Sequence, residues 1–233
     1  MPDRCPPFGY ERDRPRLVQQ TTQALEDLRT GALGDTLAMA KDSRPVHASL
    51  FAGLTPAGFE YYAGNYRGEA YECLRDCVVF AGGQPTCPPH LVLSTMAAFA
   101  ADIERAVKEV DAIPNEKLNT KLAQAIRLAA MVFDRFLRIH PYRDGNGHGA
   151  RFLVWAVLGR YDHWPVRFTV EPRPDQPPPA PSYMEMIFEY RRGNKQPLEK
   201  YFVECLKPPP APPPQQPAPA PQAQVPSTPP ASP

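Results

Sequence analysis

Residues 140–151 read HPYRDGNGHGAR and lie between the two most apolar helical patterns of this 233-residue chain. The first pattern runs from about Leu118 to Ile139, and the second from Phe152 to Tyr161. Apolar residues occupy nearly every side of the second pattern, which is typical of a helix in the middle of a core. We therefore expect residues 140–151 to form a loop that two buried helices hold in place.

The loop combines a helix stop with a tight turn. Pro141 disfavours helical geometry at His140 and so ends the preceding helix. The glycine-rich run that starts at Asp144 favours positive backbone φ angles, and we expect helix to resume near His148. Consecutive backbone N–H groups at the start of a helix attract anions. The turn is therefore a candidate anion-binding site.

Three side chains beside this turn carry chemistry. His140 is a candidate general base, Asp144 is a hard oxygen ligand for Mg²⁺, and Arg151 is a candidate clamp for a phosphate. A base, a metal-binding carboxylate and an anion site together indicate phosphoryl or nucleotidyl transfer. A zinc site made by His140, Asp144 and His148 is disfavoured, because that spacing needs a helix and three glycines would break it.

The other periodic segments predict an all-α domain with one small hairpin. Helices are expected at about residues 17–28, in pieces within 35–62, from Pro88-Pro89 to about 111, and at 183–192 and 197–206. Residues 76–87 differ, because Val78, Val79 and Phe80 favour a strand. The pair Gly82-Gly83 can supply the tight turn that follows them.

The C-terminal segment has a composition that cannot fold. Residues 208–233 contain 13 prolines among 26 residues and no charged or aromatic residue, so we expect a disordered, extended tail. A ligand for proline-binding modules and a plain spacer both fit. The spacer is favoured because Lys207 is the one flanking cation. With a flexible N-terminus at residues 1–15, one domain remains, at residues 16–207.

Charge and cysteine content exclude some classes of protein. The net charge of +1 argues against a nucleic-acid-coating surface and a polybasic membrane patch. The apolar stretches are too short to span a bilayer, and the polar start is no secretory signal. Five cysteines without a CxxC pair predict small buried thiols in a reducing compartment. We expect a cytoplasmic protein, or an effector secreted without a signal peptide.

Residues 140–151 resemble the signature of the Fic family, within the wider Fido group, which reads His-Pro-Phe-x-Asp/Glu-Gly-Asn-Gly-Arg-x-x-Arg. Residues 47–54, HASLFAGL, and residues 63–67, AGNYR, look like upstream segments of that family. The hairpin expected at 76–87, with Val78, Val79 and Phe80, falls where the family has its target-docking flap. The resemblance covers about residues 20–206 and implies a compact helical bundle.

The implied activity is transfer of AMP, or of a related nucleotide moiety, from ATP or another nucleoside triphosphate to a Tyr, Thr or Ser hydroxyl of a target protein. By position, His140 would be the base, and Asp144 would hold Mg²⁺. Arg151 would bind the terminal phosphate. The nucleotide-binding residues implied beside it are Gly145, Asn146, Gly147 and His148. Tyr142, where the family usually has Phe, would anchor the loop in the core.

His148 departs from the family pattern, which has arginine at this position. An imidazole offers less charge and fewer donors than a guanidinium, so this position would hold phosphates less tightly or suit another donor nucleotide. A phosphotransferase resembling the Doc toxin and a non-catalytic Fic module with a proline-rich partner tail are the alternatives. The family also includes members restrained by a small antitoxin, so an inhibitory protein is a further expected partner.

Overall fold

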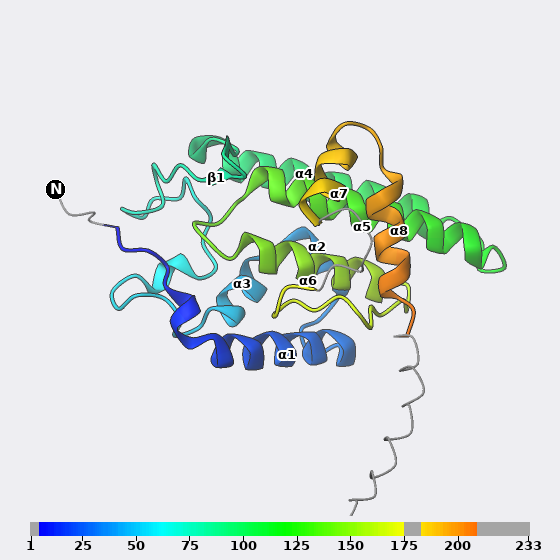
Figure 1. The fold of residues 1–233 in the computed structure, drawn as a ribbon, viewed down its shortest axis with the longest axis horizontal. Coiled ribbons are helices and arrows are strands. Elements are labelled where there is room, and N and C mark those ends of the chain that lie inside the picture. The colour runs from blue at the N-terminus through cyan, green and yellow to red at the C-terminus, as the bar shows by residue number, and fades with distance from the viewer. Residues whose placement is uncertain (1–4, 175–182, 209–233) are drawn as a thin grey trace, which may run out of the picture.

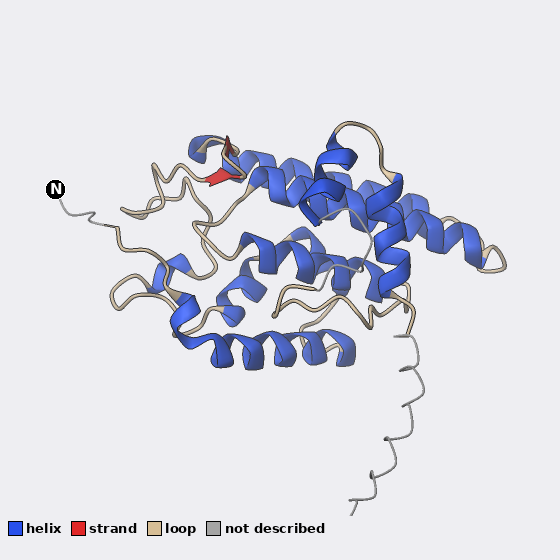
Figure 2. Ribbon diagram, viewed as in Figure 1, coloured by secondary structure: helices blue, strands red, loops and turns tan. Residues whose placement is uncertain are grey.

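The computed structural model describes residues 5–174 and 183–208 and consists mainly of helices (Figures 1 and 2). The helices are α1 (Arg14–Thr30), α2 (Thr36–Lys41), α3 (Arg44–Leu50), α4 (Pro89–Asp111), α5 (Leu118–Ile139), α6 (Asn146–Gly159), α7 (Tyr183–Arg191) and α8 (Gln196–Cys205). Short 3₁₀ turns are formed by Tyr10–Asp13 and Glu60–Tyr62, and the strands are β1 (Phe80–Ala81) and β2 (Gln84–Pro85). The all-α architecture with one small hairpin is confirmed.

Helix α6 is the centre of the bundle. In Figure 1 it lies between α1 on one side and the long pair α4 and α5 on the other. It packs most extensively on α5, and also on α2 and α1. Its residues are buried on nearly every side from Asn146 to Leu158, as its apolar composition predicts. The loop before α6 is therefore seated on the most rigid part of the fold.

The predicted helix boundaries hold for α4 and α5 and fail for α6. Helix α6 begins at Asn146, so Gly147 and Gly149 lie inside it, and the expectation that glycines break the helix here is wrong. The physical reason is close packing, because a Cβ at Gly149 would lie 3.1 Å from the Phe136 ring of α5. The zinc site stays unsupported, since the described residues contain no group of three or more potential metal ligands.

The hairpin pairs antiparallel, with Phe80 opposite Pro85. Val78 and Val79 precede β1 rather than forming part of it, although Thr86 N–H donates to the Val79 carbonyl oxygen at 3.2 Å. The Val78 and Phe80 side chains are 60% and 63% exposed. None of the helices within the described ranges is long and apolar enough to cross a membrane.

The cysteines differ from the expectation of free thiols. Cys5 and Cys73 form a disulfide, while Cys77, Cys87 and Cys205 are free. The two partners are 68 residues apart, so no local spacing signals the pair. They meet because the N-terminal segment packs on the domain, with Phe8 only 3% exposed.

The division of the chain at residues 15 and 207 stays a prediction, and residues 209–233 of the tail lie outside the described residues.

The side chain of Arg67 connects the end of α5 with the base of the hairpin. It is fully buried and donates hydrogen bonds of 2.8–3.1 Å to five acceptors. The acceptors are the carbonyl oxygens of Ile139, His140, Cys77 and Cys87 and the hydroxyl of Thr86. Its backbone N–H also donates to the Pro141 carbonyl oxygen at 2.8 Å. This guanidinium therefore sets where the loop begins.

Replacing Arg67 by alanine is expected to lower the free energy of unfolding by about 2–3 kcal/mol, because several buried acceptors lose their donor together. In a domain of this size, that loss corresponds to a fall in Tm of roughly 4–12 °C. Thermal unfolding followed by circular dichroism measures it. Arg105→Ala is the control, because the Arg105 side chain is 70% exposed. An unchanged Tm for Arg67→Ala would show that this guanidinium does not hold the loop.

Candidate active site

The loop between α5 and α6 is anchored by Tyr142 and Asn146. The Asn146 side chain accepts a hydrogen bond from Tyr142 N–H and donates one to the Tyr142 carbonyl oxygen, both at 2.9 Å. The Tyr142 ring stacks on His47 with centroids 3.6 Å apart, and its hydroxyl lies 2.8 Å from the Ser43 hydroxyl. Tyr142 is completely buried, which confirms it as the core anchor of the loop. The Asn146 side chain is thus occupied with holding the loop.

The His47 ring is hydrogen-bonded to the backbone of the turn. Gly64 N–H donates to His47 Nδ1 at 3.0 Å, so His47 Nε2 carries the proton and donates to the Asp144 carbonyl oxygen at 3.0 Å. Burial lowers the pKa of His47 to about 3, which keeps this ring neutral. Gly145 sits directly above it with φ +74°, and a Cβ there would lie 2.4 Å from the Phe51 ring. The turn requires glycine at this position on both counts.

His140 caps α5 in the left-handed region, with φ 54° and ψ 60°. Its Nδ1 lies 3.1 Å from the Leu137 carbonyl oxygen, which can only accept, so Nδ1 carries the proton. Nε2 is then left with a free lone pair, as a general base requires. Burial, with the positive charges of Arg67 and Arg191, lowers the pKa of His140 below its ordinary value. The ring is therefore neutral at pH 7.

Asp144 presents a half-satisfied carboxylate at the other side of the turn. Its Oδ1 accepts the Gly145 N–H at 2.7 Å. Burial raises the pKa of Asp144, against the opposing effects of that bond and of the Tyr10 hydroxyl. A desolvated carboxylate gains most from a cation. Mg²⁺ binds through one or two carboxylates together with substrate phosphates, so a single aspartate suits it.

Arg151 lies one turn into α6, beside the start of the helix. Its Nε donates to the Val170 carbonyl oxygen at 2.7 Å, and the residue is only 3% exposed. A Cβ at Gly147 would lie 3.1 Å from Arg151 Nη1, so the guanidinium lies close to the first turn of α6. A positive charge and backbone N–H groups of a helix start are thereby placed at one spot, which suits a phosphate.

His148 faces a carboxylate. Its Nε2 lies 3.0 Å from Glu171 Oε2, and both side chains are 8% exposed. Burial, together with the charge of Arg151, lowers the pKa of His148 to about 4, so the neutral ring donates Nε2–H to Glu171. Arg14 also donates to Glu171, at 2.7 Å. The Glu171 pKa is lowered, because these two donors outweigh the effect of burial. His148 is thus engaged with Glu171 while it lines the site.

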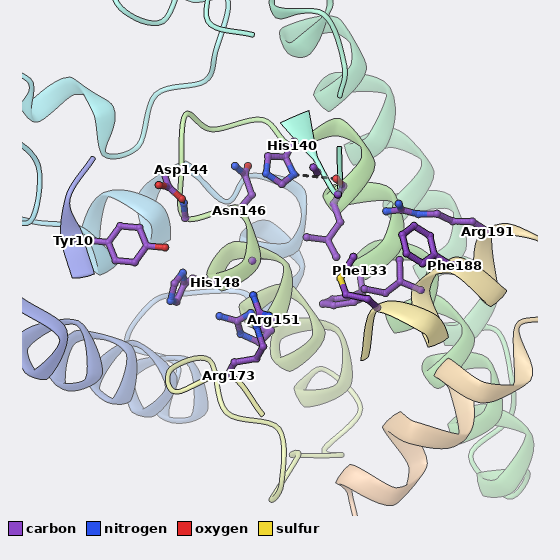
Figure 3. A pocket seen from close by; sticks show the side chains of 17 residues that line it. Tyr10, Phe133, His140, Asp144, Asn146, His148, Arg151, Arg173, Phe188 and Arg191 are labelled. Atoms are coloured by element: carbon purple, nitrogen blue, oxygen red, sulfur yellow. Dashed lines mark hydrogen bonds between the residues drawn. The ribbon is translucent and has the colours of Figure 1, made fainter. Parts of the chain in front are cut away.

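These residues line one pocket of about 280 Å³ (Figure 3). All seven of the residues expected from the loop line it: His140, Asp144, Gly145, Asn146, Gly147, His148 and Arg151. Val78, Val79 and Phe80 do not, although the next hairpin residues, Ala81 and Gly82, do. The pocket has a polar end around Asp144 and Arg151, and an apolar end formed by Phe133, Leu137, Met184, Ile187 and Phe188.

Sequence reasoning missed the pocket residues that come from distant segments. Tyr10 enters from the N-terminal segment, Arg173 from the segment after α6, and Arg191 from α7. Tyr10 and the α7 residues lie more than 30 residues from the loop along the chain, and no local pattern marks them. The pairing of His148 with Glu171 was missed for the same reason.

A family model described as Fic/DOC matches residues 39–158, which is more than half of the chain and includes the whole loop. The chain belongs to the Fic/DOC family. Among curated proteins, the "Protein adenylyltransferase Fic" of Nematostella vectensis is 29% identical over 87 residues, which is 37% of this chain and 19% of that protein. The protein of the same name from Culex quinquefasciatus is 27% identical over 86 residues, or 37% and 16%. The matched region thus spans under a fifth of those relatives.

Solved Fic structures share the fold. A Fic-domain-containing signaling protein from Bacteroides thetaiotaomicron superposes with a TM-score of 0.54 and 18% identity, covering 82% of this chain and 68% of that one. The BepC protein of Bartonella tribocorum, solved with bound AMPPNP, gives a TM-score of 0.51 and 17% identity, covering 83% and 87%. The helical bundle with its hairpin is therefore the Fic fold.

Proposed function

We propose that this Fic-family chain is a nucleotidyltransferase that moves AMP, or a related nucleotide moiety, from a nucleoside triphosphate to a hydroxyl side chain of a target protein. The observation that supports the proposal is the pocket, which is lined by a neutral histidine, a desolvated carboxylate and the cationic start of a helix. Two further facts support it. Curated relatives are named protein adenylyltransferases, and the Bartonella relative was solved with a nucleotide analogue bound.

In this proposal His140 accepts a proton, and the other loop residues bind the phosphates and the metal. His140 Nε2 accepts the proton of the target hydroxyl as its oxygen bonds to the α-phosphorus and the bond to the pyrophosphate breaks. Asp144 would hold Mg²⁺, which supplies positive charge to the phosphates when bound. The backbone N–H groups at Asn146 and Gly147 and the guanidinium of Arg151 would surround the anion, while the Gly145 N–H is bonded to Asp144 beside them. His148 is neutral and adds no positive charge to the phosphate site. Its part is the hydrogen bond to Glu171 at the edge of that site.

The two ends of the pocket suit the two ends of a nucleotide. The apolar end, between α5 and α7, offers Phe133 and Phe188 to a planar base. Arg173 lies with Arg151 at the polar end, where the phosphates would bind. The exposed Val78 and Phe80 of the hairpin lie next in sequence to pocket residues, and with Val79 they remain the proposed docking flap for the target.

Labelled ATP tests the proposal. The full chain is incubated with Mg²⁺ and ATP labelled on the α-phosphate, alone and with a cell lysate. Transfer of the label to protein, and an intact mass increased by one AMP on any self-modified chain, are expected. The incubation is repeated with ATP labelled on the γ-phosphate. Transfer of the γ label without transfer of the α label would indicate a phosphotransferase instead. A chain that binds none of the four common nucleoside triphosphates would contradict both readings and leave a non-catalytic module.

The pH profile of labelling should report the lowered pKa of His140. Because the base must be neutral, labelling is lost as pH falls through the pKa of His140, which lies below the ordinary 6.5. Asp144 must be ionised to hold Mg²⁺. Because its pKa is raised, protonation of Asp144 also lowers the rate of labelling in acid. The rate should therefore be highest near pH 8 and fall in acid with a midpoint below pH 6.5. A midpoint above pH 6.5 would contradict the environment described for His140.

A further inference from the structure

The segment between the disulfide and α1, residues 5–13, lies across the loop and is here named the strap. It starts at Cys5, which is bonded to Cys73, and ends where α1 begins at Arg14. Cys73 belongs to the segment between the 3₁₀ turn Glu60–Tyr62 and the hairpin. The strap is thus tied down at both ends, once by the helix and once by a bond that reduction can break.

Tyr10 of the strap covers the polar end of the pocket. Its ring packs edge-on against His148, with centroids 5.5 Å apart, and tilts against Phe51 at 5.2 Å. In Figure 3 its hydroxyl points into the pocket beside Asp144 and His148. Tyr10 and Asp144, the residue assigned above to Mg²⁺, thus line the same end of the pocket. A cation held by Asp144 and phosphates bound at the start of α6 would therefore lie next to this side chain.

The strap is held between its ends by contacts that depend on where Cys5 lies. Arg143, inside the loop, donates to the carbonyl oxygens of Cys5 at 2.9 Å and Pro6 at 3.1 Å. Phe8 is buried against Phe51 and Tyr62. Chain ends that are held at one side only tend to fray. Without the disulfide, the strap would be ordered by the bonds from Arg143, the bond from the Tyr62 hydroxyl to the Pro6 carbonyl oxygen and the packing of the Phe8 and Tyr10 rings.

We propose that the Cys5–Cys73 disulfide is a redox latch that keeps Tyr10 over the nucleotide pocket, and that its reduction frees the strap and opens the polar end. This inference rests on the proposed function for the identity of the ligand. A dithiol reductant supplies the electrons. One of its thiolates attacks one cysteine sulfur and displaces the other; its second thiol then closes the disulfide of the reductant, and Cys5 and Cys73 leave as thiols.

The first arm of the test follows the strap itself and needs no ligand. Unfolded without reductant, the oxidised chain should show three reactive thiols, and after reduction five. Hydrogen exchange of residues 5–13 should be slow in the oxidised chain and as fast as in unstructured chain after reduction or in Cys5→Ser. Cys87→Ser is the matched control, because Cys87 is free and bonds to Pro88 and Thr95 instead. A strap that stays protected after reduction overturns the latch, whatever the chain binds.

The second arm measures binding of MgATP by calorimetry. If the oxidised pocket is open about a tenth of the time, reduction should lower the apparent Kd by about tenfold. Tyr10→Ala should bind as tightly with the disulfide intact, and reduction should then add little. A released strap with an unchanged Kd overturns the gating role of Tyr10. If MgATP binds neither the oxidised chain, nor the reduced chain, nor Tyr10→Ala, the proposed function is contradicted. Hydrogen exchange then still decides whether reduction releases the strap.

Discussion

His140→Ala is expected to lower the rate of labelling by about 100-fold or more, because a positioned general base contributes roughly 10²–10⁴-fold. The neutral ring with a free Nε2 is the base that the pocket offers. Folding should survive, since the side chain makes one hydrogen bond, to the Leu137 carbonyl oxygen. The Tm should therefore change by only a few degrees, as for a loss of about 1 kcal/mol.

His140→Asn separates the base from the backbone that carries it. Asparagine adopts the left-handed conformation of this position readily, so it removes the base without straining the end of α5. It should be as inactive as alanine. His90→Ala is the control, because His90 is exposed at the start of α4 and does not line the pocket. Labelling retained in His140→Asn would remove His140 from the role of base.

Asp144→Asn is expected to weaken Mg²⁺-dependent ATP binding by about 100-fold or more, a loss of about 2.7 kcal/mol. The substitution keeps an oxygen for the Gly145 N–H and removes the negative charge that would hold the metal. Asp144→Ala should lose as much binding and also free that N–H. Calorimetry with ATP in the presence and absence of Mg²⁺ measures both.

Asp27→Asn is the control for Asp144, because Asp27 lies on α1 outside the pocket and interacts with Gln23. It should bind MgATP as the wild type does. The residual binding of Asp144→Asn should no longer depend on Mg²⁺. A variant that still gains affinity from Mg²⁺ would show that another group holds the metal, and the assignment of Asp144 would fail.

The sequence predicted the parts of the site that are contiguous in the chain. Helix α5 ends at Ile139, as Pro141 indicates, and His140, Asp144, His148 and Arg151 line one pocket. Such a prediction works because helix periodicity and the conformational preferences of proline and glycine act over a few residues. The start of α6 was misplaced, because Gly149 serves the close approach of α6 to Phe136, a contact between helices.

By itself, the sequence determined the helical class, the limits of α4 and α5, the hairpin and the loop with its histidine, carboxylate and arginine. Only the tertiary structure decided what else surrounds them. It brought Tyr10 into the pocket with Asp144, paired His148 with Glu171, and joined Cys5 to Cys73 across 68 residues. These contacts follow from how distant segments pack on the core, and packing depends on shape and burial in three dimensions, which a pattern along one chain does not encode locally.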